Sequence, residues 1–142
     1  MVKKTNIGRR FLAGLIDYSI IWTVSFLIIM ILGTPNDEGT YELAGLPAII
    51  PVLYWFLMIV VIESTFGATI GNTIMGLKPV PLNNHNSKIS FSQSLRRHLL
   101  DVVDMIFFGI VGIVTIKNSE HHQRVGDIWA GTTVIRIKNN TR

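Results

Sequence analysis

The sequence predicts an all-α integral membrane protein, a small helical bundle with a short cytoplasmic β element. Its 142 residues are 49% hydrophobic and 15% charged, whereas soluble domains carry charge at about 25% of their positions. The charges also gather between long apolar blocks, because no charged residue occurs at 18–36 or at 43–62. Each block matches the roughly 20 residues that an α-helix needs to cross a bilayer. We therefore expect one membrane domain over residues 1–142.

The first predicted membrane helix covers about residues 8–32. Basic residues precede it, as they precede a secretory signal, but its apolar core is too long and no small-x-small cleavage site follows it. The second predicted helix covers about residues 46–62. Pro47 suits its first turn, where a missing backbone donor is harmless, and Pro51 predicts a slight kink.

The charges around these two helices predict their orientation through the positive-inside rule. The connection between them has no basic residue and carries Asp37, Glu38 and Glu42. Basic residues instead precede the first helix and follow the second, and they are Lys3, Lys4, Arg9, Arg10, Lys78, Lys88, Arg96 and Arg97. We therefore expect a multi-pass protein of the cell membrane with a cytoplasmic N-terminus and a cytoplasmic 64–98 region.

The third apolar segment allows two interpretations. Ser90 and Gln93 match a capping box, which predicts a helix that starts at the membrane surface. A straight continuation to position 116 would span the bilayer, but it would leave a basic tail outside, which the positive-inside rule disfavours. Gly109 and Gly112 offer a break that returns the C-terminus to the cytoplasm, provided that other helices cover it. We favour this returning form, and the span is the alternative. The tail residues concerned are Lys117, Arg124, Arg136 and Lys138.

The tail at 132–137 is rich in β-branched residues and partly alternating, which predicts a short strand. The segment 77–81 is its candidate partner, although Pro79 and Pro81 restrict it to an edge with few ladder hydrogen bonds. This pairing would itself require a cytoplasmic C-terminus.

Asp17 interrupts the first apolar block, where an acidic residue costs about 2.5 to 3.5 kcal/mol on insertion scales. Something must compensate that cost. Arg10 lies about 700° of helical rotation and roughly 10 Å before it, on the same face, and is the nearest candidate counter-charge. Ala13 and Gly14 lie between them and allow another helix to approach closely. Asp17 therefore either holds the bundle together or takes part in transport.

Two further carboxylates, Asp101 and Asp104, follow Arg97 at spacings of four and three residues. On a continuous third helix the three side chains share a face. Together with Asp17 they would line a hydrated cavity, as in proton or cation pathways. The alternative is that the carboxylates lie at the membrane surface near the start of the helix.

Three ordered motifs resemble those of the RDD family of membrane proteins. They are Arg10-x-x-Ala13-x-x-x-Asp17, Gly67-Ala68-Thr69-Ile70-Gly71 with Met75-Gly76-Leu77-Lys78, and Arg124-Val125-Gly126-Asp127-Ile128-Trp129-Ala130-Gly131-Thr132-Thr133-Val134. The family is named for one arginine and two aspartates, and the resemblance implies that Arg10, Asp17 and Asp127 are these residues. It also implies a largely unassigned molecular function, for which transport of unknown ligands is the usual suggestion.

The glycines of the second motif, Gly67, Gly71 and Gly76, do not have the spacing or the Lys-Ser/Thr ending of a phosphate-binding loop. Turns and close helix packing are the favoured interpretation. Asp127 with Arg124 forms either a gate latch or, as we favour, a salt bridge that anchors the tail.

The sequence lacks the residue patterns that several classes of chemistry require. The chain has no cysteine, its four histidines form no ligand set, and no catalytic triad pattern is present, so we expect no metal site, no cofactor and no enzyme. Basic residues flank membrane segments, which indicates a lipid bilayer rather than nucleic acid as the partner.

Two function classes remain. In the first, a homo-oligomer transports an ion or small solute, and Asp17, Asp101 and Asp104 bind a cation or proton. In the second, a non-catalytic accessory or regulatory module uses the same polar groups to hold another membrane protein. Three or four short helices cannot surround a solute pathway alone, so transport requires an oligomer.

Overall fold

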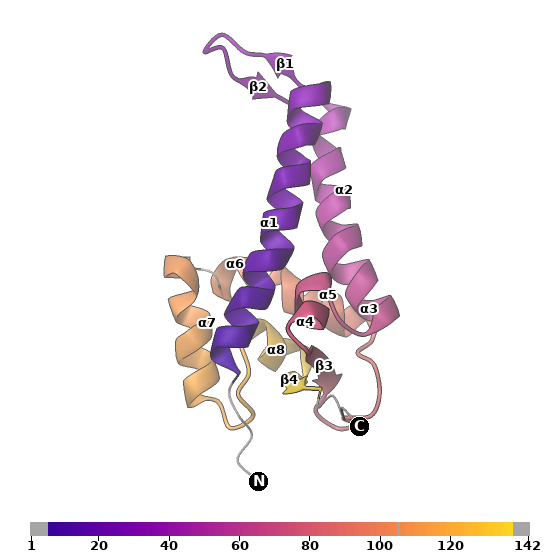
Figure 1. Cartoon of the computed structure of the whole chain (residues 1–142), viewed down its shortest axis with the longest axis vertical. Coiled ribbons are helices and arrows are strands. Elements are labelled where there is room, and N and C mark those ends of the chain that lie inside the picture. Colours follow the sequence, from indigo (N-terminus) through magenta and orange to yellow (C-terminus); the bar gives the residue numbers. More distant parts are fainter. Residues whose placement is uncertain (1–5, 105, 138–142) are drawn as a thin grey trace.

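The computed structural model describes residues 6–104 and 106–137 and shows a long helical hairpin above a base of short elements (Figure 1). The first helix, α1 (Ile7–Leu32), begins within one residue of its predicted start and ends at its predicted end. Two short antiparallel strands, β1 (Thr34–Pro35) and β2 (Tyr41–Glu42), form the connection at the far end of the hairpin. Lys3, Lys4 and Lys138, which contribute to the predicted orientation, lie outside the described residues.

The second long helix continues to Phe66, four residues beyond its predicted end, through segments of different winding. They are η1 (Leu46–Ile49), α2 (Ile50–Phe56), the π-helical η2 (Leu57–Val61) and α3 (Ile62–Phe66). The π turn was not predicted. Its wider winding leaves the Val60 carbonyl oxygen available to side chains, and this oxygen accepts hydrogen bonds from the hydroxyls of Ser64 at 2.8 Å and Ser94 at 3.3 Å.

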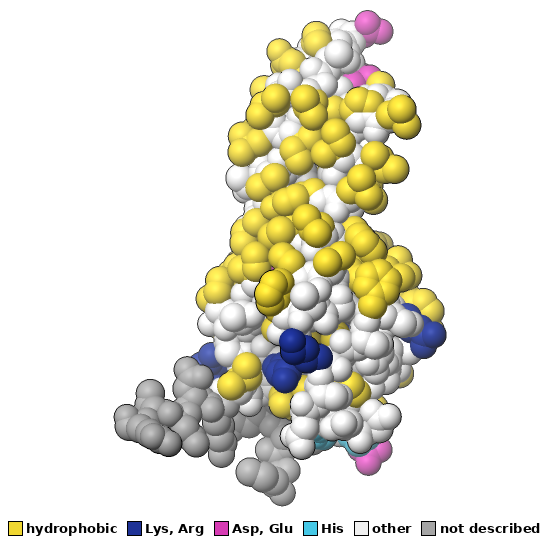
Figure 2. All heavy atoms as spheres, turned by 90° about the vertical axis from the view of Figure 1, so that its right-hand side faces the viewer, with side chains coloured by type: hydrophobic (Ala, Val, Ile, Leu, Met, Phe, Trp, Pro, Cys, Tyr) yellow, Lys and Arg dark blue, Asp and Glu magenta, His cyan; other side chains and the backbone are white. Residues whose placement is uncertain are grey.

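The two long helices are long and apolar enough to cross a membrane. They bury only a small core against each other, around Ile21, Ile59 and Val60. Many of their apolar side chains are exposed, and Figure 2 shows this surface covering the upper part of the molecule. In the same view, basic side chains lie below the apolar surface, and acidic side chains lie at the upper tip and at the lower end. The basic side chains in this view therefore lie at the end of the apolar surface that is nearer the base.

The base consists of short helices and one strand pair. Its elements are α4 (Ile70–Ile74), β3 (Leu77–Pro81), α5 (Phe91–Leu99), α6 (Asp101–Asp104), α7 (Ile106–Asn118), α8 (Val125–Ala130) and β4 (Thr132–Arg136). The predicted capping box is confirmed, since Ser90 accepts from the Gln93 amide and the Gln93 side chain accepts from the Ser90 amide. The predicted strand pairing is also confirmed, because β3 and β4 pair antiparallel from Leu77↔Arg136 to Pro81↔Thr132.

The third apolar segment is not one straight helix. The chain leaves helical geometry at Leu100, between α5 and α6, and not at the predicted Gly109 and Gly112, which both lie within α7. From there α7 returns along α1 towards the end of the molecule at which α1 begins (Figure 1). Gly109 has a φ of +86°, a conformation that favours glycine. Gly112 packs against α6, where an added Cβ would lie 3.2 Å from the Asp104 carbonyl oxygen. Of the described residues, only the two long helices qualify as candidate spans.

The glycines expected to allow close packing differ in their surroundings. Gly71 packs α4 onto α1, because an added Cβ would overlap the Ala13 carbonyl oxygen and lie 2.8 Å from Asp17 Oδ2. Ala13 is buried in this contact. Gly14 has no described atom within 4 Å of an added Cβ, so the small face predicted from Ala13 and Gly14 does not act as one surface. Gly67 and Gly76 have φ values of +91° and +65° and form turns.

Replacing Gly71 by alanine is expected to lower the free energy of unfolding by about 1–3 kcal/mol, as overpacking in a closed contact does. Denaturant unfolding in mild detergent measures this loss. Gly14→Ala is the matched control on the facing helix and is expected to leave stability unchanged or to raise it by up to about 1 kcal/mol through helix propensity. Equal stabilities of the two variants would contradict the observed contact.

Candidate functional site

A cluster of buried and partly buried ionisable side chains holds the base to the hairpin. We call it the charge cluster, and it comprises Arg10, Glu63, Arg97, His98, Asp101, Asp104, Arg124 and Asp127. These residues come from both long helices and from the helices or helix starts of α5, α6 and α8, so all but the two local pairs, His98 with Asp101 and Arg124 with Asp127, join elements that are distant in sequence. With His98 protonated, the cluster contains four cations and four carboxylates. It is then electrically neutral.

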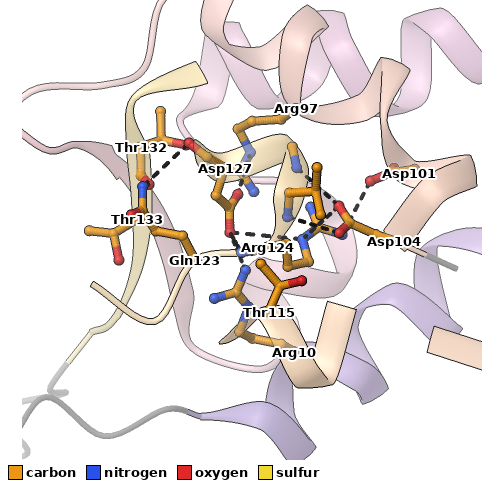
Figure 3. A network of polar contacts seen from close by, with 12 residues as sticks. Arg10, Arg97, Asp101, Asp104, Thr115, Gln123, Arg124, Asp127, Thr132 and Thr133 are labelled. Carbon is orange, nitrogen blue, oxygen red and sulfur yellow. Dashed lines mark hydrogen bonds and ion pairs between the residues drawn. The ribbon is translucent and has the colours of Figure 1, made fainter. Parts of the chain in front are cut away.

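Asp127 lies at the centre of the arginines, between Arg10 and Arg97 (Figure 3). Its carboxylate pairs with the Arg10 guanidinium, lies 3.4 Å from Arg97 Nε and 3.9 Å from Arg124 Nε, and accepts the Arg124 backbone N–H at 3.1 Å. Burial alone would raise its pKa, but the three arginines hold the pKa of Asp127 well below its usual range. Asp127 is therefore a buried anion that three elements share.

A second chain of contacts is built on His98 in α5. Its Nε2 lies 2.9 Å from Glu63 Oε2, and its Nδ1 lies 2.8 Å from Asp101 Oδ2, so both ring nitrogens face carboxylates. Ser94 and Tyr18 donate their hydroxyls to Glu63 and Asp101, each at 2.8 Å. Burial opposes a charged imidazole, but the two carboxylates raise the pKa of His98 to about 9. Since both carboxylates need a donor, the protonated imidazolium is the form that satisfies them.

Asp101 and Asp104 differ in what they bind, although both belong to α6. Asp101 accepts from Arg124 Nη1 at 3.1 Å, and despite its burial His98 and then Arg124 lower its pKa to about 2. Asp104 accepts the backbone N–H groups of Val125 and Gly126, at 3.0 and 3.2 Å, which are open donors in the first turn of α8. Burial raises the pKa of Asp104. The prediction that Arg97, Asp101 and Asp104 share a face of one helix is wrong, because the chain breaks at Leu100 and Arg97 binds Glu63 and Asp127 instead.

Asp17 lies apart from the charge cluster. It accepts the Thr69 hydroxyl and the Gly71 backbone N–H, both at 2.7 Å, and so caps the start of α4. No salt bridge joins Asp17 to any residue within 6–104 or 106–137. Arg10, the nearest candidate counter-charge in the sequence, does not pair with Asp17, because its guanidinium extends into the base and binds Asp127 and the His122 carbonyl oxygen.

The tail contact expected for Asp127 takes a wider form than predicted. The pair with Arg124 is present, and the Asp127 carbonyl oxygen also accepts the Thr132 hydroxyl at 3.4 Å, which ties the start of β4 to α8. Glu63 and His98 were missed as cluster members. The available signal for Glu63 was a single carboxylate directly after a membrane-length apolar block, a position that demands a partner.

The pH dependence of stability is expected to report His98. The pKa of His98 is about 9 in the folded protein against 6.5 for an unperturbed histidine. The stabilisation is therefore complete below pH 6.5 and is lost as the pH rises through 9. Unfolding in detergent measured across this range is expected to show falling stability.

His98→Gln is expected to remove most of that fall while it lowers stability at neutral pH, because glutamine cannot carry the charge. His85 lies in an exposed loop, and His85→Gln is the control that keeps the wild-type profile. A wild-type profile in the His98→Gln variant would rule out the imidazolium.

The charge cluster is built from ion pairs and hydrogen bonds within the chain. No group of three or more described histidine, aspartate or glutamate residues is placed to hold a metal ion. The carboxylates of the charge cluster instead face guanidinium, imidazolium or amide donors. The ion pairs from Arg97 to Glu63 and Asp127, at 3.6 and 3.4 Å, are longer than hydrogen bonds and leave buried polar atoms that ordered water can satisfy.

Comparison with known proteins gives one match. The model of the RDD family matches residues 4–131, which is nearly the whole chain and includes every residue of the charge cluster. No curated protein and no solved structure matches the chain. This match covers well over half of the chain, and the chain therefore belongs to the RDD family.

Proposed function

We propose that this protein is a multi-pass protein of the cell membrane that acts as a non-catalytic accessory module for another membrane protein. The hairpin of α1 and the second long helix crosses the bilayer. The base lies on the cytoplasmic side, together with both chain ends. The exposed apolar surface of the two long helices supports the membrane location. The return of α7 along α1 supports a position of both chain ends on the same side of the membrane.

One observation carries the accessory role. Each charged residue that the sequence singled out has a partner within the chain: Arg10 binds Asp127, Asp17 caps α4, Asp101 binds His98, and Asp104 caps α8. Carboxylates that bind a transported cation must be able to exchange it for their resting partner. Here the resting partners are backbone amides, the Thr69 and Tyr18 hydroxyls, the His98 imidazole and the Arg124 guanidinium, all of which belong to packed elements of the same chain. Carboxylates with such fixed partners favour a rigid structural role over a proton or cation relay.

A second candidate, transport of a proton or cation by a homo-oligomer, has one observation in its favour. Asp17 is held by neutral donors alone, the Thr69 hydroxyl and the Gly71 amide. An intramembrane carboxylate without a counter-charge is the group that a proton or cation would neutralise. Two spans per chain cannot enclose a pathway, so this role requires several copies.

Two measurements on purified protein distinguish these candidates. The first is oligomeric state in mild detergent and in nanodiscs, and the second is proton and sodium flux in liposomes. The accessory role is expected to give a monomer and no flux above that of empty liposomes. A stable homo-oligomer that carries a flux sensitive to Asp17→Asn would overturn it.

The proposed topology gives a further expected result. Because the natural chain has no cysteine, single cysteines report each side cleanly. Asp37→Cys, in the loop between β1 and β2, is expected to react with an impermeant thiol reagent on intact cells. Asn118→Cys, at the exposed end of α7, is expected to react only after the membrane is opened. Labelling of both variants from outside would instead mean that the third apolar segment spans the bilayer.

A further inference from the structure

We propose that Lys78 and Lys88, together with the exposed ring of Phe66, form a docking site for an anionic phospholipid at the end of the second long helix. The headgroup phosphate binds the two ammonium groups, and the acyl chains pack against the helix. The inference rests on the membrane location proposed above and adds a specific lipid site to it.

The two lysines converge on one glycine. The second long helix ends at Phe66, and Gly67 turns the chain with a φ of +91°. A Cβ at Gly67 would lie 3.6 Å from Lys88 Cδ and 3.7 Å from Lys78 Cε. The arms of a lysine in β3 and a lysine in the loop before α5 therefore pass over the same point, which the missing side chain leaves open.

The positive charge at this point is not balanced within the described part of the chain. Lys88 Nζ donates to the Thr65 carbonyl oxygen at 3.0 Å, which holds it at the helix end and leaves two N–H donors. No salt bridge joins either lysine to a described carboxylate, in contrast to the arginines of the charge cluster. Two like charges held close together repel each other unless an anion lies between them. A headgroup with net negative charge supplies that anion.

The level of the site in the molecule indicates lipid as the source of the phosphate. Phe66 is 74% exposed and is the last residue of the apolar helix, directly before Gly67. Figure 2 faces the side of the molecule on which α3 lies, and basic side chains appear there just below the apolar surface. Aliphatic lysine arms that end at this boundary match the snorkelling of lysine towards headgroups. A soluble anion would make no use of the exposed phenyl ring.

Lipid selectivity tests the inference directly. The protein is reconstituted in nanodiscs of phosphatidylcholine, and spin-labelled phosphatidylglycerol and phosphatidylcholine are compared by the fraction held immobile at the protein surface. The wild type is expected to prefer phosphatidylglycerol. Lys78→Gln and Lys88→Gln are each expected to weaken that preference about fivefold, which is the usual contribution of one lysine near anionic lipid. Lys117→Gln, at the end of α7, removes the same charge elsewhere and is expected to keep it.

The outcomes separate this inference from the membrane location. Incorporation of the wild type and all variants into phosphatidylcholine nanodiscs checks the location independently, and a wild type that stays outside the discs would overturn the location. An incorporated protein whose selectivity is unchanged in Lys78→Gln and Lys88→Gln would overturn the lipid site alone. An equal loss in Lys117→Gln would also overturn it, because the preference would then follow net charge.

Discussion

Asp127→Asn is expected to lower the free energy of unfolding by about 3–5 kcal/mol, the usual cost of breaking a buried ion pair by removing one partner. The carboxylate is fully buried and faces Arg10, Arg97 and Arg124. Asparagine keeps the shape and can still accept the Arg124 backbone N–H, so the loss measures the missing charge. Denaturant unfolding in mild detergent gives the value, and Asp37→Asn in the exposed loop is the control with no expected change.

A double-mutant cycle identifies the partner. Arg10→Gln alone is expected to destabilise the protein, and Arg10→Gln with Asp127→Asn is expected to lose less than the sum of the two single changes, because the second change removes the charge that the first leaves unpaired. The same cycle with Asp17 in place of Asp127 is expected to be additive, since Arg10 does not contact Asp17. Additivity of Arg10 and Asp127 together with coupling of Arg10 and Asp17 would mean that the pairing seen in the structure is wrong.

The sequence predicted the features that depend on local patterns. The two long helices follow from apolar length, the capping box at Ser90 from a four-residue pattern, and the pairing of β3 with β4 from β-branched residues and prolines at an edge. Each of these signals lies within a short segment of the sequence. Their agreement with the structure shows that hydrophobic length and local hydrogen bonding dominate these elements.

The partners of the charged residues could not be predicted in the same way. Arg10 and Asp127 are 117 positions apart, and only the tertiary fold brings them together. Helical periodicity placed Arg10 and Asp17 on one face, but α4 offers Asp17 an amide and a hydroxyl at closer range. The π turn before Glu63 has no simple sequence signature, and with it the link from the hairpin to His98 was missed.

Asp17→Ala is expected to lower the free energy of unfolding by about 1–3 kcal/mol for each donor that it leaves buried and unpaired, the Thr69 hydroxyl and the Gly71 amide. Asp17→Asn is expected to behave differently. Its amide oxygen can accept from Gly71 and its amide nitrogen can donate to the Thr69 oxygen, so both contacts survive without a charge. Because no described cation compensates the carboxylate, removing that charge is expected to leave stability unchanged or to raise it.

The Asp17→Asn variant also decides between the two function classes, since it keeps the fold and removes only the ionisable group. In the accessory role, the variant is expected to insert, to retain the wild-type unfolding profile and to support partner-dependent activity at the wild-type level. In the transport role, the same folded variant loses flux completely, because an amide cannot take up a proton or balance a cation. A well-folded Asp17→Asn protein that has lost wild-type activity would therefore exclude a purely structural Asp17, whereas retained activity would assign the carboxylate to capping α4.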